Sequence, residues 1–129
     1  MRWRRHRSLL QEYLRQRARG VTARLTAGFW VAAYLARLRL AGIPAYVARG
    51  DETAGAVVVK AATLDGQARA YRRQFDLALD AQVWVVLAEG DEGAVDAVLV
   101  RERARDPDLW VIELEDRAGR TLLGEDGLA

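Results

Sequence analysis

The chain has 129 residues, of which 51% are hydrophobic and four are tryptophan, and it contains no cysteine. That length and composition suffice for one domain with its own hydrophobic core. The missing cysteines exclude disulfide frameworks, thiolate zinc sites, iron–sulfur clusters and cysteine nucleophiles. The single histidine, His6, excludes a Ser-His-Asp triad and a multi-histidine metal site within one chain.

Positive charge is concentrated at the N-terminus. The first twenty residues hold seven arginines and one acid, Glu12, whereas the remaining residues hold 13 basic and 17 acidic side chains. The formal net charge of +2 thus combines a basic arm with an acidic domain. We divide the chain into a basic N-terminal extension, residues 1–20, and a single domain, residues 21–129. Two interpretations of the extension stay open: a translated arm, or upstream sequence before a start at Val21, because GTG encodes valine and is also a bacterial start codon.

The sequence predicts a cytoplasmic protein without a membrane partner. The basic start resembles the first part of a signal peptide, but no apolar run of about 7 to 15 residues follows it. No stretch of the sequence is long and apolar enough to span a bilayer.

Two helices are expected before the first strand. Leucines and a tyrosine at helical spacing indicate a short helix over residues 8–19, ended by Gly20. Thr26 is the expected cap of a longer helix that continues through Leu40, and Gly42 and Pro44 end it.

The rest of the chain alternates between strand and helix patterns. Short strands are expected over residues 45–49 and 109–115, and a hairpin is expected from strands 55–64 and 67–75, joined by Asp65-Gly66. The apolar run 83–87 predicts a central strand buried on both faces. Asp91 is the expected cap of a helix through Arg105, and residues 121–123 are expected to form a short edge strand. This order predicts an α+β fold: a mostly antiparallel sheet of about five strands, with two helices packed on one face.

The hairpin suggests a candidate binding surface. If Asp65-Gly66 is a two-residue loop, Lys60 lies opposite Tyr71, and directly opposed residues share a face. One face of the hairpin then carries Lys60, Arg69, Tyr71 and Arg73, which are three cations beside one aromatic ring. Exposed charged sheet faces are common, so the favoured interpretation is a solvated or partner-covered surface, and the alternative is a site for an anion or a single-stranded nucleic acid. Lys60 is also the only lysine in the chain.

Other chemistries leave weaker signals. Neither the phosphate loop Gly-x-x-x-x-Gly-Lys nor the fingerprint Gly-x-Gly-x-x-Gly is present. Glu113 and Glu115 share a strand face, and together with Asp65 they suggest a divalent-metal enzyme as the weakest alternative. We predict no catalytic residues, no resident cofactor and no metal site.

From Val21 onward, the chain resembles a family of short alphaproteobacterial proteins labelled domain of unknown function 1491. Five segments carry the resemblance: 25–35 (LTAGFWVAAYL), 41–45 (AGIPA), 55–60 (GAVVVK), 84–90 (WVVLAEG) and 106–113 (DPDLWVIE). The resemblance implies a bacterial cytosolic domain and supplies no catalytic residues.

The leading hypothesis is a non-enzymatic binding or protein-interaction module whose partner is another protein or a second copy of the chain. It follows because apolar residues recur at the spacing expected of a hydrophobic core, whereas the sequence does not indicate that an acid, a base and a nucleophile come together. Exposed Tyr71 and Trp110 would favour it, because aromatic residues often anchor interfaces. The alternative is nucleic-acid or anion binding through the basic arm and the face of Lys60, Arg69, Tyr71 and Arg73.

Overall fold

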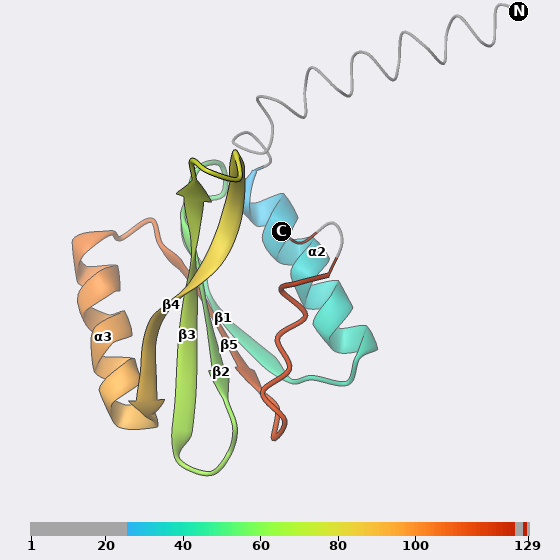
Figure 1. Cartoon of the computed structure of the whole chain (residues 1–129), viewed down its shortest axis with the longest axis vertical. Coiled ribbons are helices and arrows are strands. Elements are labelled where there is room, and N and C mark those ends of the chain that lie inside the picture. The colour runs from blue at the N-terminus through green and yellow to red at the C-terminus, as the bar shows by residue number, and fades with distance from the viewer. Residues whose placement is uncertain (1–25, 126–127, 129) are drawn as a thin grey trace, which may run out of the picture.

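The computed structural model describes residues 26–125 and residue 128. These residues form one five-stranded sheet, in which the strands lie in the order β1-β5-β2-β3-β4. Two helices lie on opposite faces of this sheet (Figure 1). The basic extension and the short helix expected over residues 8–19 lie outside the described residues.

The first helix of the described chain, α2 (Ala27–Leu40), begins where the sequence predicts. Its cap Thr26 has an extended backbone, and its hydroxyl accepts a hydrogen bond of 3.2 Å from the Phe29 amide. The helix ends at Leu40, and Gly42 just beyond it has a positive φ of 73°, which suits glycine. One stripe of α2 is buried against the sheet and comprises Ala27, Trp30, Val31, Tyr34 and Leu38.

Strands β2 (Val57–Ala62), β3 (Gln67–Asp76) and β4 (Ala81–Asp91) form an antiparallel meander. Strand β1 (Ala45–Ala48) pairs antiparallel with β5 (Trp110–Glu115) at the other edge of the sheet. The second helix, α3 (Glu92–Arg105), follows β4 and is capped by Asp91, whose carboxylate accepts a hydrogen bond from the Ala94 amide. Among the residues that the structure describes, the predicted helices and strands are therefore present, apart from the segment 121–123, which is not a strand.

The expected arrangement of these elements is wrong in two respects. The sheet is mixed and not mostly antiparallel, because α3 returns the chain from the β4 edge and inserts β5 parallel to β2. The helices also cover different faces and not one. Alternate residues of a strand point to opposite faces, so Val59 and Ala61 of β2 face α2, while Val58 packs in the cluster beneath α3.

The apolar run 83–87 was expected in the centre of the sheet, and this is also wrong. It belongs to β4, which is an edge strand, and residues 83–85 and 87 are only half-buried. The strands covered on both faces are β2 and β5, which lie between neighbours and beneath both helices. The apolar composition of residues 83–87 therefore did not identify the strand at the centre of the sheet.

Tyr34 joins α2 to the C-terminal segment. Its side chain is fully buried, and its hydroxyl donates a 2.7 Å hydrogen bond to the carbonyl of Thr121. We expect Tyr34→Phe to lower the free energy of unfolding by about 1 kcal/mol, because the Thr121 carbonyl loses its buried donor. Urea unfolding of the variant would measure this loss, and an unchanged midpoint would contradict the role assigned to the hydroxyl.

No helix in the described part of the chain is long and apolar enough to cross a membrane.

Candidate functional site

The structure divides the predicted surface of Lys60, Arg69, Tyr71 and Arg73 between the two faces of the sheet. Lys60 pairs with Ala70 and Val59 pairs with Tyr71, a register one residue away from the expected one. The cause is a longer loop: the Thr63 amide donates to the Gln67 carbonyl, so residues 64–66 form a three-residue connection. A shift of one residue moves a side chain to the other face, and Lys60 is thereby separated from the other three.

Lys60 lies beneath the first turns of α3 and is buried, with 4% of its surface exposed. Its Nζ is 2.8 Å from Glu92 Oε2, 2.5 Å from Asp96 Oδ1 and 3.3 Å from Glu113 Oε1. Glu92 and Asp96 are four residues apart on the inner side of α3, whereas Glu113 lies on β5. One ammonium thus ties the helix to two central strands.

The neighbouring carboxylates stabilise the charged form of Lys60. Burial by itself would lower the pKa of the ammonium, but the hydrogen bonds to Asp96 and Glu92 outweigh it and raise the pKa above its usual value. A lysine that keeps its proton is a poor nucleophile or base. We therefore assign Lys60 a structural role.

The divalent-metal alternative loses one of its ligands to this cluster. Glu113 faces Lys60, and Asp65 is engaged in the hairpin loop, where it accepts hydrogen bonds from Thr63 and Gln67. Among the residues that the structure describes, no three acidic or histidine side chains gather in a way that could hold a metal ion.

Arg69 and Tyr71 lie on the α2 face of β3, beside a shallow pocket of about 480 Å³. The guanidinium of Arg69 is 2.8 Å from Glu89 on the neighbouring strand. Tyr71 is half-buried and packs against the α2 core, and Trp110 is only 3% exposed. The exposed aromatic pair that would have favoured an interface at Tyr71 and Trp110 is therefore not present.

Arg73 lies further along β3, among aromatic rings. Its guanidinium carbon is 5.1 Å from the ring centre of Trp30 and 5.4 Å from that of Trp84. Burial lowers the pKa of Arg73 from its usual value, although arginine stays charged at neutral pH. A positive charge is thus held at the side of the sheet where α2 begins.

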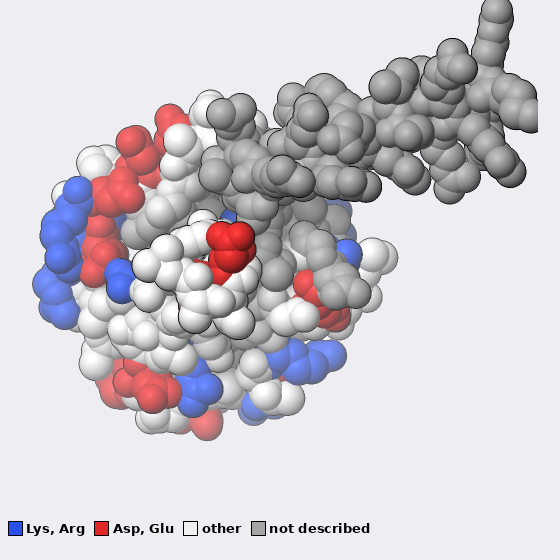
Figure 2. Space-filling view, turned by 45° about the horizontal axis from the view of Figure 1, so that its top comes forward, with Lys and Arg blue, Asp and Glu red and all other residues white. Residues whose placement is uncertain are grey.

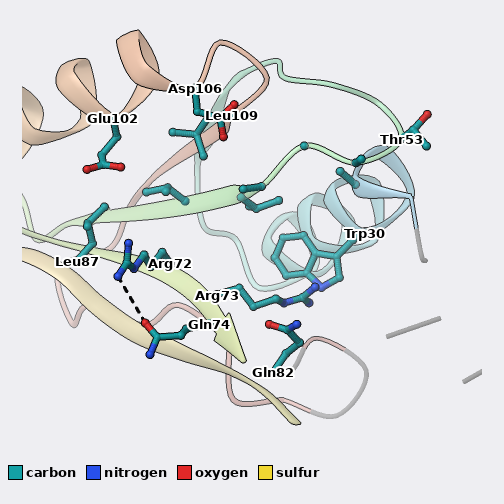
Figure 3. A pocket seen from close by; sticks show the side chains of 16 residues that line it. Trp30, Thr53, Arg72, Arg73, Gln74, Gln82, Leu87, Glu102, Asp106 and Leu109 are labelled. Carbon is teal, nitrogen blue, oxygen red and sulfur yellow. Dashed lines mark hydrogen bonds between the residues drawn. The ribbon is translucent and has the colours of Figure 1, made fainter. Parts of the chain in front are cut away.

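This charge lines a pocket with a volume of about 700 Å³, which is larger than the pocket beside Arg69 and Tyr71, and we call it the main pocket. The pocket opens at the end of the sheet where β2 begins: Val58 is the first β2 residue that pairs with β3, opposite Arg72, while β3 continues to Asp76 against β4. Its walls come from the start of α2, the end of α3, residues 53–58 and the β3–β4 hairpin. Figure 3 shows Trp30, Arg73 and Gln82 at one side, and Glu102, Asp106 and Leu109 at the other.

The rim of the pocket is built by Asp51. Its carboxylate accepts hydrogen bonds from the amides of Ala54 (2.8 Å) and Thr53 (2.9 Å), and these bonds lower its pKa. The carbonyl of Asp51 accepts from the indole of Trp110, and the Glu52 carbonyl accepts from the Gly28 amide at the start of α2. The rim is therefore fixed to both the helix and the sheet.

An exposed apolar turn extends from the same hairpin. Residues 77–80 connect β3 to β4, and in this turn Leu77 is 87% exposed and Leu79 is 66% exposed. The Leu79 amide donates to the carboxylate of Asp76, which fixes the turn. The turn lies at the same end of the molecule as the start of α2 (Figure 1), where Phe29 is also 64% exposed. Figure 2 tilts this end forward and shows a largely uncharged surface interrupted by red acidic atoms.

We call this end of the molecule, with the pocket and the apolar turn 77–80, the pocket end. Sequence reasoning included Arg73 in its surface but missed Trp30, Gln74 and Gln82. A weak signal was available, since the two glutamines flank an apolar turn. Trp30, however, reads as an ordinary core residue of an amphipathic helix.

Comparisons with known proteins agree with the fold. Residues 25–124 match a family model described as "Protein of unknown function (DUF1491)". A crystal structure of a DUF1491 family protein from Caulobacter crescentus CB15 is similar, with 39% identity, a TM-score of 0.69 and coverage of 78% of this chain and 94% of that one. An NMR structure of a DUF1491 family protein from the same organism has 40% identity and the same coverage and TM-score. A solution structure of an A. tumefaciens protein has 29% identity and a TM-score of 0.59, and covers 71% of this chain and 86% of that one. No curated protein matches the chain significantly.

Proposed function

The chain belongs to the DUF1491 family, described as proteins of unknown function, and we propose that its domain is a non-enzymatic module that binds a partner protein at the pocket end. The observation that carries this proposal is the turn 77–80, which exposes two leucines at the tip of the hairpin whose residues Gln74 and Gln82 line the main pocket. Exposed apolar side chains grouped beside a cavity are typical of interaction sites.

The side chains at the pocket end indicate which side chains the partner segment is expected to carry. The exposed leucines and Phe29 suit apolar side chains, and Arg72, which lines the pocket from the α3 face, suits an acidic group. The partner segment is therefore expected to carry apolar residues next to a carboxylate.

The side chains that line the pocket favour binding over catalysis. Thr53 is the only hydroxyl among its lining residues in the described chain, and Figure 3 shows it at the opposite end of the pocket from Glu102. Glu102 is itself 2.8 Å from Arg105. A nucleophile adjacent to a general base, which covalent catalysis needs, is not formed by these lining residues.

Nucleic-acid or anion binding is the second candidate. The α2 face of β3 still places Arg69, Tyr71 and Arg73 in a row, without Lys60. Arg69 is engaged by Glu89, so this face offers less positive charge than the sequence alone suggests. Binding of single-stranded nucleic acid at this face would weaken steeply as salt rises.

Site-directed crosslinking tests the proposed function cleanly, because the chain contains no native cysteine. Leu77→Cys would carry a benzophenone label at the pocket end, and Val100→Cys would carry it on the outer side of α3, where Val100 is 69% exposed. In extract of the native host, we expect a discrete adduct from position 77 and none from position 100. Adding Leu79→Ser to the Leu77→Cys chain should reduce the yield several-fold, because it removes an apolar contact.

An adduct of twice the chain mass would identify the partner as a second copy. Equal labelling from both positions, or no adduct from position 77, would contradict the proposed function.

A further inference from the structure

Strand β4 forms a long open edge of the sheet. It has eleven residues and pairs with β3 on its inner side, from Ala81 to Asp91. Within the described part of the chain, residues 81–90 make no backbone–backbone hydrogen bond outside this ladder. Figure 1 shows no described helix or strand across the outer edge of β4. Alternate residues of β4 thus direct their N–H and C=O groups outward, where another strand can pair with them.

The outer edge of β4 lacks most of the features that keep an edge strand from pairing. Natural proteins guard long edges with charged side chains, proline or a bulge. Residues 81–88 contain no charged residue and no proline. The irregularity in the ladder with β3 is a bulge at Leu87, between the partners of Tyr71 and Ala70. Residues 81–86 precede this bulge and form a regular, uncharged edge.

A second copy of the chain suits this edge, because β4 can pair with itself. The other edge strand that the structure describes, β1, has only four residues. Pairing of β4 with β1 of another copy would leave most of β4 uncovered and would continue from copy to copy without closing. Two β4 strands pair antiparallel about a two-fold axis instead, so the dimer is closed and both long edges are covered.

Charge and regularity place the two-fold axis at Trp84. An axis one residue earlier would put the carboxylate of Asp80 opposite Val86 of the second copy, and an unpaired charge is costly against an apolar side chain. An axis one residue later would draw the bulge residue Leu87 into the pairs. With the axis at Trp84, residues 82–86 pair with the same residues of the second copy, and all of them are uncharged and regular.

This register brings apolar side chains together on both faces of the sheet. Trp84 packs in the α2 cluster, so Gln82 and Val86 share the α2 face, where each lies opposite the other across the axis. Val86 is 48% exposed in the single chain and gains a neighbour there. On the α3 face, Val83 lies opposite Val85 of the second copy, and this pair also occurs twice. Cross-strand pairs of β-branched residues stabilise a sheet.

We propose that the outer edge of β4 pairs with β4 of a second copy, so that two chains form a symmetric dimer with a continuous ten-stranded sheet. This dimer does not require the partner proposed for the pocket end.

Light scattering of the full-length chain during size-exclusion chromatography tests the dimer. We expect twice the mass of one chain at high micromolar concentration and a fall toward one chain on dilution. Val86→Lys should raise the dissociation constant at least about tenfold, because a lysine on an edge strand opposes pairing with another strand. Val47→Lys makes the same change at the β1 edge, where Val47 is 36% exposed, and should alter the dissociation constant less than about twofold. A wild-type chain that is monomeric at every concentration, or equal effects of the two lysines, would overturn the proposal.

The register is tested by disulfide formation, because the chain has no native cysteine. A chain that carries both Gln82→Cys and Val86→Cys places each thiol opposite the other kind in the second copy, so mild oxidation should give a covalent dimer. Either substitution alone leaves the two thiols four residues apart along the strands, or roughly 13 Å, which is too far for a disulfide. A covalent dimer from a single variant, or none from the double variant, would contradict pairing about Trp84.

The crosslinking and mass measurements together separate this dimer from the proposed function. If position 77 crosslinks a partner and the wild-type chain is monomeric at every concentration, the dimer is contradicted and the proposed function stands. If the chain dimerises through β4 and position 77 gives no adduct, or only a dimer adduct that Val86→Lys abolishes, the dimer stands and a partner held at the pocket end is contradicted.

Discussion

Replacing Lys60 by methionine is expected to lower the free energy of unfolding by about 3 kcal/mol. The change leaves Glu92, Asp96 and Glu113 facing one another around an apolar side chain, without the ammonium that holds them together. Removing one partner of a buried ion pair costs about 3–5 kcal/mol, and we place the loss at the lower end because the three carboxylates are 40–48% exposed. Urea unfolding followed by tryptophan fluorescence would measure it.

A second substitution separates charge from packing. In the Lys60→Met background, Asp96→Asn should recover about 1 kcal/mol, because it removes one of the three mutually repelling charges. A loss below about 0.5 kcal/mol for Lys60→Met, or no recovery with Asp96→Asn, would contradict the structural role of this cluster.

The contribution of Lys60 should also depend on pH in the alkaline range. Its folded-state pKa is raised, so the unfolded chain releases the lysine proton first as the pH rises past the usual pKa of 10.5. The stability difference between wild type and Lys60→Met should therefore be constant from about pH 7 to 9 and shrink above about pH 10.5. A stability difference between wild type and Lys60→Met that grows with pH in this range would contradict the raised pKa of Lys60.

Gly55→Ala is expected to destabilise the domain by about 2 kcal/mol and to distort the pocket. A Cβ at this position would overlap the backbone carbonyl of Asp108 and lie 2.8 Å from both the Asp51 carbonyl and the Trp110 ring. Neither carbonyl can move without breaking the hydrogen bonds that fix the pocket rim. Overpacking of this kind costs about 1–3 kcal/mol. Thermal and urea unfolding would measure the loss.

Gly124→Ala is the matched control. A Cβ at Gly124 meets no atom within 4 Å, and the backbone there is not left-handed. We expect a change within about 0.5 kcal/mol of wild type. If Gly55→Ala were as mild as Gly124→Ala, the close approach of residues 50–55 to the strand β5 would be wrong.

The local structure of this domain was readable from its sequence because caps and turns act over a few residues. Thr26 and Asp91 cap the two helices as predicted, and Gly42 follows the first helix. The hairpin register was not readable, because it depends on Leu64, which takes a left-handed φ of 64° that residues other than glycine seldom adopt. A loop one residue longer than expected then moved Lys60 to the other face.

The arrangement in space depended on long-range packing, which no local pattern records. Nothing in residues 110–115 indicates that they insert beside β2 rather than extend an edge, and this insertion makes the sheet mixed. The pocket end has the same origin: Trp30 is distant in sequence from the β3–β4 hairpin, and the two line one pocket because β3 and β4 extend beyond the first residue of β2.

The most direct test of binding at the pocket end uses the partner segment recovered from the position-77 adduct. Mass spectrometry of that adduct identifies the segment, and a synthetic peptide of its sequence would be added to the ¹⁵N-labelled full chain. We predict that the perturbed signals gather on Trp30, Gln74, Leu77 and Gln82, while those of Tyr46 at the β1 edge and Val100 on α3 stay unchanged. Perturbations centred on the β1 edge or on the shallow pocket beside Arg69 would contradict binding at the pocket end.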